Sequence, residues 1–266
     1  MRINVVSVNH GTTRYAELML ESLVRHHPDR TSMRMLVLDN DSPDVERLQR
    51  FAADGITVQQ SGYTTTAAVT THGEILRDAV LADSDCDAYC FVDCDVCFCR
   101  DDTVDMLAAE LDAGPDLFGV QASWLKPDGS ALAEAESPRR PRSEISERVR
   151  PLPDGAWSEP TSYAVELQLD DRIHPFCAVI ENSPEFRSVV ENLGLSPAAV
   201  QCERGGKWWD TLGLLTQVMK THRRTWRRSD VGVIHFGNVS WDPQWAAEKA
   251  ADRERLMRQY TRHSSR

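Results

Sequence analysis

The chain is poor in positive charge and has no long apolar run. Its 266 residues include 30 lysines and arginines against 41 aspartates and glutamates, which gives a formal net charge of −11. Nonspecific binding of nucleic acid requires a basic face, so this balance argues against that class of protein. No apolar stretch approaches the roughly 20 residues that a membrane-spanning helix needs.

Residues 1–9 lack the charged leader and the cleavage site of a secretory signal. Internal repeats and low-complexity tracts are also missing. A hydrophobic fraction of 41% and a charged fraction of 27% are typical of a soluble globular protein. We therefore expect one cytoplasmic α/β domain over residues 1–266, with peripheral contact at the inner face of a membrane and the oligomeric state left open.

The cysteines are crowded, because five of the seven lie within residues 86–99. Crowded cysteines are typical ligands of zinc and iron–sulfur sites, but this spacing matches no standard ligand pattern. Several have apolar neighbours typical of a strand core, where free cysteine acts as a small hydrophobe. We therefore predict core packing rather than a metal cluster. The seven are Cys86, Cys90, Cys94, Cys97, Cys99, Cys177 and Cys202.

Apolar strands and amphipathic helices alternate along the first half of the chain. This alternation predicts a mostly parallel sheet covered by helices on both faces. Ligands of such sheets bind at the carboxyl ends of the strands, and polar residues follow three predicted strands at Asn9, Asp39 and Asp93. The predicted strands are 3–8, 33–38, 56–59, the run that ends at Asp93 and Asp95, and 117–120. The predicted helices are 14–27, 43–53, 72–82 and a stretch from Val104 to Leu111. The helix at 43–53 is expected to have Ser42 as its N-cap and Pro43 at its first position.

The second half of the chain begins with a less regular stretch. Residues 121–173 carry several prolines and weak apolar periodicity, which predicts a long irregular insert. Its arginine group at 139–142 is either a solvated loop or a contact for an anionic acceptor. Order returns with a strand at 174–180, a helix from Ser183, a helix marked by Trp208, Leu212, Leu215 and Met219, a strand at 231–236 and a charged helix at 243–262.

Two carboxylates one residue apart interrupt the apolar run Tyr89–Val96. Side chains at i and i+2 of a strand share a face, so we expect Asp93 and Asp95 to project together. Two adjacent anions are costly unless a cation lies between them. The pair therefore favours a divalent ion that carries a phosphorylated substrate, with a solvated turn as the alternative.

Several short segments follow one another along the chain: the loop after the first strand, Leu38–Asp44, His72-Gly73, Phe91–Val96, Asp210 and Val233–Asn238. Their order resembles that of the GT-A glycosyltransferases, closest to family 2. The resemblance implies a Rossmann-like α/β fold, with a nucleotide-sugar-binding half at 1–120 and an acceptor-side half with a C-terminal helix at 174–266. It leaves the insert at 121–173 unmatched.

The resemblance also implies a site for the nucleotide. Asp39, at the end of the second strand, would accept hydrogen bonds from the base. Residues around Ser7, Val8 and Asn9 would flank the same nucleotide, and Asp93 would face the ribose or the metal. The implied donor is a nucleotide sugar, most simply UDP-linked, and the acceptor is a small molecule, a glycan or a lipid-linked compound.

The remaining implied roles concern the metal and the proton. Asp95 would ligate Mn²⁺ or Mg²⁺ together with Asp93, and His235 matches the position of a late histidine that contacts the metal or the diphosphate. Asp210 would accept the proton of the acceptor hydroxyl in an inverting transfer. We expect Asp210 early in a helix, where the helix dipole keeps it ionised.

Two other functions stay open on the sequence alone. The segment Phe91–Val96 also resembles the nucleophile strand of haloacid-dehalogenase-like phosphohydrolases, with Asp93 phosphorylated and Asp95 handling protons. That motif normally lies on the first strand of its domain, whereas three predicted strands precede it here. The third alternative is a nucleotide-sugar-binding protein without turnover. No pattern assigns a role to His10, His72 or His174.

Overall fold

A computed structural model describes residues 1–63, 68–132, 147–148, 161–162, 172–196, 198–200, 207–209, 211–237, 239–240 and 243–261. Helices and strands alternate along the chain, as the sequence predicts. The elements are β1 (Ile3–Asn9), α1 (Thr13–His26), β2 (Met33–Asp39), the 3₁₀ helix η1 (Val45–Asp54), β3 (Ile56–Gln60), α2 (Ala68–Ala82), β4 (Ala88–Val92), β5 (Val96–Cys97), α3 (Thr103–Asp112), β6 (Leu117–Leu125), β7 (Glu147–Arg148), β8 (Thr161–Ser162), β9 (Cys177–Glu181), α4 (Pro184–Asn192), β10 (Ala198–Val200), β11 (Lys207–Trp209), α5 (Gly213–Thr221), β12 (Thr225–His235) and α6 (Pro243–Thr261).

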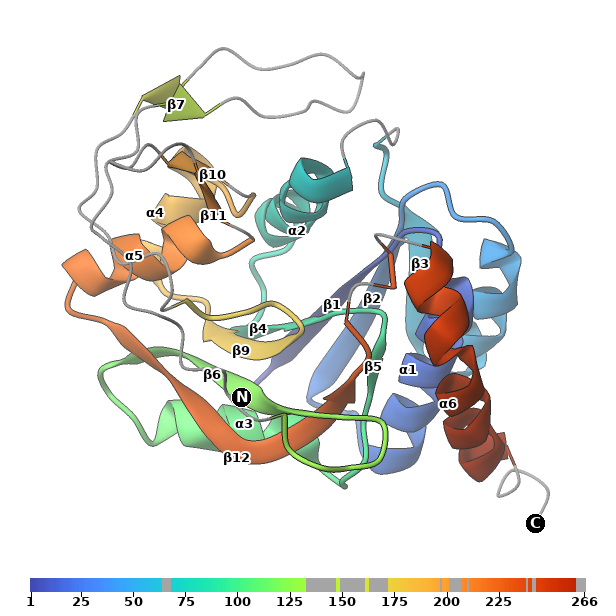
Figure 1. Ribbon diagram of the computed structural model, residues 1–266. Coiled ribbons are helices and arrows are strands. Elements are labelled where there is room, and N and C mark those ends of the chain that lie inside the picture. The colour runs from blue at the N-terminus through green and yellow to red at the C-terminus, as the bar shows by residue number, and fades with distance from the viewer. Residues whose placement is uncertain are drawn as a thin grey trace.

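The centre of the described structure is an eight-stranded sheet of order β3-β2-β1-β4-β9-β6-β12-β5 (Figure 1). The strands β3, β2, β1 and β4 run parallel to one another, and β6 runs parallel to β12. Strand β9 is antiparallel to both of its neighbours, and β5 is antiparallel to β12. The sheet is therefore mixed around a parallel half, and the carboxyl ends of β1, β2 and β4 share one edge.

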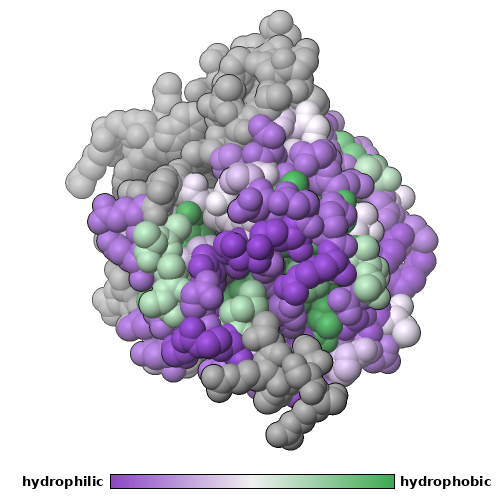
Figure 2. Space-filling model, turned by 90° about the vertical axis from the view of Figure 1, so that its right-hand side faces the viewer, coloured by the Kyte–Doolittle hydropathy of each residue, from purple (hydrophilic) through white to green (hydrophobic). Residues whose placement is uncertain are grey.

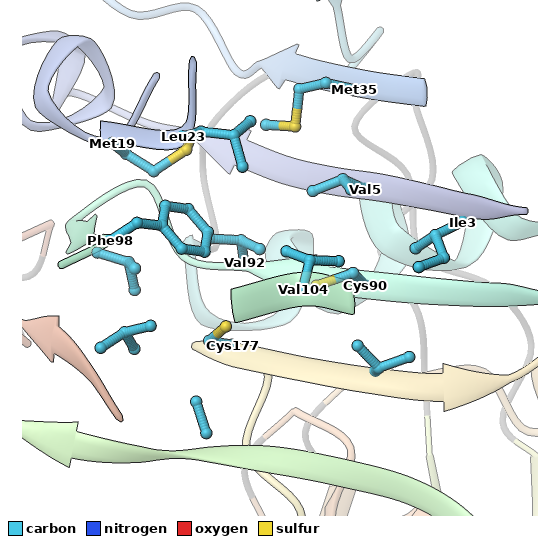
Figure 3. Packing of buried hydrophobic residues seen from close by; sticks show 14 of the residues in the cluster. Ile3, Val5, Met19, Leu23, Met35, Cys90, Val92, Phe98, Val104 and Cys177 are labelled. Atoms are coloured by element: carbon cyan, nitrogen blue, oxygen red, sulfur yellow. The ribbon is translucent and has the colours of Figure 1, made fainter. Parts of the chain in front are cut away.

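Apolar residues cover both faces of the sheet, because neighbouring residues of a strand point to opposite sides. Ile3 and Val5 belong to a core shared with α1, η1 and α3, whereas Val6 and Val8 belong to a second core shared with α2, α4 and α5. Figure 3 shows part of the first core. A third, smaller cluster joins α1 and β5 to α6.

The cysteines pack as the sequence predicts. Cys90 and Cys177 lie inside the first core (Figure 3), and Cys86, Cys94 and Cys97 are buried as well. Cys99 is exposed. Cys202 lies outside the described residues.

Several predicted boundaries differ from the structure. The segment at 45–54 is a 3₁₀ helix whose N-cap position is Asp44 with a φ of 59°, so Ser42 is not its N-cap. Ser42 instead accepts a hydrogen bond from the backbone N–H of Gly11. Trp208 belongs to strand β11, and α5 begins only at Gly213. Strand β6 runs on to Leu125, into the stretch that we predicted to be irregular.

Helix α6 packs against α1 and presents a mostly hydrophilic face (Figure 2). Small hydrophobic patches interrupt this face, and Trp245 is 42% exposed. None of the described helices combines the length and the apolar character that a bilayer crossing requires.

A buried histidine links the end of α1 to the start of α3. The His27 ring is fully buried, with Nδ1 3.1 Å from the carbonyl oxygen of Leu23 and Nε2 accepting the backbone N–H of Val104 at 3.1 Å. Asp102, at the N-cap position of α3, makes no capping hydrogen bond with its side chain. The neutral His27 ring therefore caps α3 from outside the helix.

We expect the His27 cap to make stability sensitive to acid. Burial lowers the pKa of His27. Below about pH 6.5 the unfolded chain therefore binds a proton at this residue, whereas the folded ring stays neutral to a lower pH. The free energy of unfolding of the natural protein should therefore fall relative to that of His27→Gln as the pH drops below this value, and a tenfold difference in proton affinity between the folded and unfolded states is worth about 1.4 kcal/mol. Urea unfolding of both proteins from about pH 7.5 to about pH 5.5 measures the difference. Parallel pH profiles would contradict the prediction.

Candidate active site

The two predicted metal-binding acids lie in a turn and not on a strand. Strand β4 ends at Val92, and the backbone N–H of Val96 donates to the carbonyl oxygen of Asp93 at 3.1 Å before β5 begins. The expectation that alternation along a strand aligns the two carboxylates is therefore wrong in its geometry. The turn still brings Asp93 and Asp95 to the same place, at the carboxyl end of β4.

His235, at the end of β12, completes a group of three potential metal ligands. Its Nε2 lies 3.2 Å from Oδ1 of Asp95 and 3.5 Å from Oδ2 of Asp93. One ligand atom of each residue lies within 4.8 Å of the others, and among the described residues this is the only such group of three or more acids, histidines or cysteines. Asp95 and His235 are 5% and 8% exposed, and the side chain of Asp93 is 27% exposed, so the group opens to solvent on one side.

The position of the His235 ring is set by two aromatic side chains. Phe176 stacks on it with ring centroids 4.8 Å apart and an angle of 11° between the planes, and the Trp124 centroid lies 4.3 Å away. The indole N–H of Trp124 donates to the carbonyl oxygen of His235 at 2.7 Å. Gly237 makes this close packing possible, because a Cβ there would come within 2.8 Å of the Trp124 ring.

Lys249 holds the backbone that follows His235. Its Nζ donates to the carbonyl oxygen of Phe236 at 2.6 Å and also to that of Gly237. Helix α6 therefore fastens the segment that carries the histidine, although it contributes no ligand itself. Together with the aromatic contacts, this supports His235 in an orientation that turns Nε2 toward the two acids.

The two carboxylates of the site change the pKa of His235. Burial lowers the pKa of His235, but the carboxylates of Asp95 and Asp93 outweigh burial and raise it above its usual value. No described residue forms a hydrogen bond with the buried Nδ1 atom of His235. Two carboxylate oxygens and one imidazole nitrogen converging on one point are a donor set that suits a divalent ion such as Mn²⁺.

The predicted base-binding acid, Asp39, is completely buried below the strand ends. Asn9 donates to its Oδ1 at 2.8 Å, while the backbone N–H of Ser42 and the side chain of Gln60 donate to its Oδ2 at 3.0 and 3.2 Å. The sequence thus predicts correctly that Asn9 and Asp39 lie together. In the structure both connect the ends of β1 and β2 rather than facing open space.

A cavity of about 500 Å³ opens above these strand ends. Of the five residues predicted to contact the nucleotide, Val8 and Asp93 line it, while Ser7, Asn9 and Asp39 are fully buried and lie beneath. The cavity is also lined by His10, Asn40, His72, Arg172, His174 and Thr211, together with the metal-site residues and the aromatic pair around His235.

The structure assigns a place to three histidines that the sequence left without a role. His10, His72 and His174 all line the cavity. The Nε2 atom of His72 lies 3.8 Å from Oδ1 of Asp93, and its Nδ1 lies 3.5 Å from the hydroxyl of Thr211. Isolated histidines carry no spacing signal, so only the fold brings them together.

Gly73 shows why the pair His72-Gly73 stands out in the sequence. A Cβ on Gly73 would lie 2.3 Å from the Cα of Ser196 and 2.8 Å from the carbonyl carbon of Leu195. Glycine therefore lets α2 approach this backbone closely, which carries His72 to the cavity. The predicted catalytic base, Asp210, lies outside the described residues.

No protein-family model and no curated protein sequence matches the chain. Solved structures match it. PcManGT, a mannosyltransferase from Pyrobaculum calidifontis solved in complex with GDP-Man and Mn²⁺, is 15% identical, with a TM-score of 0.53 over 97% of this chain and 64% of its own. S. aureus TarS is also 15% identical, with a TM-score of 0.52 over 100% of this chain and 44% of its own.

This chain has the GT-A fold. The predicted fold class is thereby confirmed, and the likeness at this identity concerns the fold alone. The chain spans less than two thirds of the length of either protein. Within the GT-A fold, the group of Asp93, Asp95 and His235 lies at the carboxyl edge of the sheet, where the alternation of strands and helices predicts a ligand.

Proposed function

We propose that the protein is a metal-dependent glycosyltransferase that moves a sugar from a nucleotide-sugar donor to an acceptor hydroxyl. The observation that carries the proposal is the convergence of Asp93, Asp95 and His235 at the edge of a cavity in a chain with the GT-A fold. In this proposal these three side chains hold Mn²⁺ or Mg²⁺. When bound, the ion supplies Lewis-acid stabilisation of the charge that grows on the departing diphosphate.

The nucleotide is proposed to lie over the ends of β1 and β2. Val8, His10 and Asn40 line this part of the cavity, and His10 Nδ1 lies 3.0 Å from the carbonyl oxygen of Asn40. For Asp39 to accept a hydrogen bond directly from the base, Gln60 must release the Oδ2 atom to which it now donates. We propose a UDP-linked donor, and a comparison with GDP-linked sugars tests the choice of base.

The proposed transfer is an inverting displacement. The acceptor oxygen forms a bond to the anomeric carbon, the bond from that carbon to the diphosphate oxygen breaks, and its electron pair leaves with the nucleoside diphosphate. The hydroxyl proton passes to a base, for which we propose Asp210.

The direct test is incubation of the protein with UDP- and GDP-linked sugars, with and without Mn²⁺. Release of the nucleoside diphosphate only in the presence of the metal supports transfer. Release of inorganic phosphate from phosphate esters would instead favour the phosphohydrolase alternative. Saturable nucleotide binding without turnover, over a broad panel of acceptors, would favour the binding-protein alternative.

One structural observation argues against the phosphohydrolase. Enzymes of that class use a later lysine beside the nucleophilic aspartate, and no lysine lines the cavity in the described part of the chain. The basic side chains that line the cavity are instead histidines and one arginine. This composition suits a site in which a metal ion carries most of the positive charge.

Asp210→Asn is expected to separate binding from turnover. The change removes a proton acceptor but keeps the size of the side chain, so transfer should fall by about 100-fold or more. Donor binding, measured by calorimetry with Mn²⁺ and the nucleotide, should stay within about twofold of the natural protein. Unchanged transfer would remove Asp210 as the base.

A further inference from the structure

The wall of the cavity opposite the proposed nucleotide site is built from the segment that leads into β9. Its residue Phe176 accepts the backbone N–H of Asp93 at 3.0 Å, so this segment lies beside the metal-site turn. Arg172 and His174, four and two residues before Phe176, line the cavity. His72 and Thr211 line it as well, from α2 and from the approach to α5.

This wall is held in place by protein contacts over three consecutive residues. Nη1 of Arg172 donates a hydrogen bond to the carbonyl oxygen of Thr211 at 2.8 Å. The backbone N–H of Ile173 donates to the hydroxyl of Thr216 at 3.1 Å, and that of His174 to Oε1 of the buried Gln121 at 2.6 Å. The backbone is therefore fixed at Ile173 and His174, and the Arg172 guanidinium is held at Thr211 beside the cavity.

The charge of the wall is of one sign. Among the described residues that line the cavity, the only acids are Asp93 and Asp95, and the proposed function assigns both to the metal. The other side chains there that can carry charge are basic, and His72, Arg172 and His174 belong to the wall opposite the nucleotide. A guanidinium is always charged, and an imidazole offers an N–H even when neutral, so this wall can donate several hydrogen bonds to one anion.

We propose that this wall is an acceptor subsite for an anionic group, so that the acceptor is a hydroxyl compound that carries a phosphate or a carboxylate. Arg172 and His174 bind the anion, and the acceptor hydroxyl points toward the metal-site turn. This inference rests on the proposed function and adds the chemical class of the acceptor. It concerns Arg172 and His174, which differ from the arginine group at 139–142 that lies outside the described residues.

The test is calorimetric titration of the protein loaded with Mn²⁺ and the tightest-binding nucleoside diphosphate. The probes are glycerol 1-phosphate, glycerate and glycerol, which share a hydroxyl and differ in charge. We expect saturable binding of a charged probe at millimolar concentration and no binding of glycerol. Arg172→Gln and His174→Asn should each weaken that binding about tenfold or more. Arg34→Gln, an equal loss of charge at an exposed residue of β2, should leave it unchanged.

The outcomes separate this inference from the proposed function. If no nucleoside diphosphate binds with Mn²⁺, the proposed function fails and the subsite fails with it. If the nucleotide binds but both charged probes behave like glycerol, only the acceptor subsite is refuted. Equal weakening of nucleotide and probe by Arg172→Gln would place this residue on the donor diphosphate and overturn the proposal. A choice between the two charged probes identifies phosphate or carboxylate.

Discussion

Asp95→Asn is expected to abolish metal-dependent binding of the nucleotide. Asp95 is almost fully buried, and its Oδ1 faces Nε2 of His235 at 3.2 Å, so its carboxylate has a fixed position in the group of three. Asparagine keeps the shape but removes the negative charge that a hard divalent ion requires. Changes in the outer shell of metal sites already cost about 10- to 100-fold in affinity, so loss of a direct ligand should cost more than about 100-fold.

Calorimetry with Mn²⁺, first alone and then with UDP or GDP, measures this effect. The matched control is Asp101→Asn. Asp101 is also paired with a histidine, with its Oδ1 2.7 Å from Nδ1 of His26. Its side chain, however, is 79% exposed, and Asp101 does not line the cavity. The control should bind metal and nucleotide like the natural protein. Wild-type affinity in Asp95→Asn would refute the metal site and, with it, the proposed function.

The affinity for Mn²⁺ is expected to rise steeply with pH. The carboxylates of Asp95 and Asp93 overcome the effect of burial and raise the pKa of His235, so the metal-free ring keeps its proton to a higher pH than a free imidazole does. That proton must leave before the imidazole can bind a metal. Below the raised pKa, each unit of pH should therefore cost about tenfold in apparent affinity, and above it the affinity should level off.

The same shift acts on stability with the opposite sign. In the metal-free protein the raised pKa of His235 stabilises the fold fully below the unfolded value of about 6.5, and this contribution is lost as the pH rises through the folded pKa. Added Mn²⁺ should compensate at the higher pH, which thermal unfolding with and without the ion measures. His235→Gln should remove most of the pH dependence of metal binding, and an unchanged slope in this variant would contradict the assignment.

The candidate site was only partly predictable from the sequence. The pair Asp93 and Asp95 stands out because carboxylates interrupt an apolar run, and His235 because it ends a late strand in a recognisable order of segments. The reason first expected for the alignment of the acids was wrong, since a turn aligns them and not a strand. Asp39 likewise follows the predicted strand, but its burial depends on contacts from the last residues of two other strands, Asn9 of β1 and Gln60 of β3, and from Ser42 in a loop.

The sequence by itself determined the α/β class, the strands that carry polar residues at their ends, and the core role of the buried cysteines, because these follow from local periodicity and composition. Only the tertiary structure decided that β9 inserts antiparallel beside β4, and that His72 and Arg172 meet the metal-site turn at one cavity. The reason is physical. Local patterns record which side of an element is apolar, whereas the meeting of distant polar side chains depends on how the packed layers close around one another.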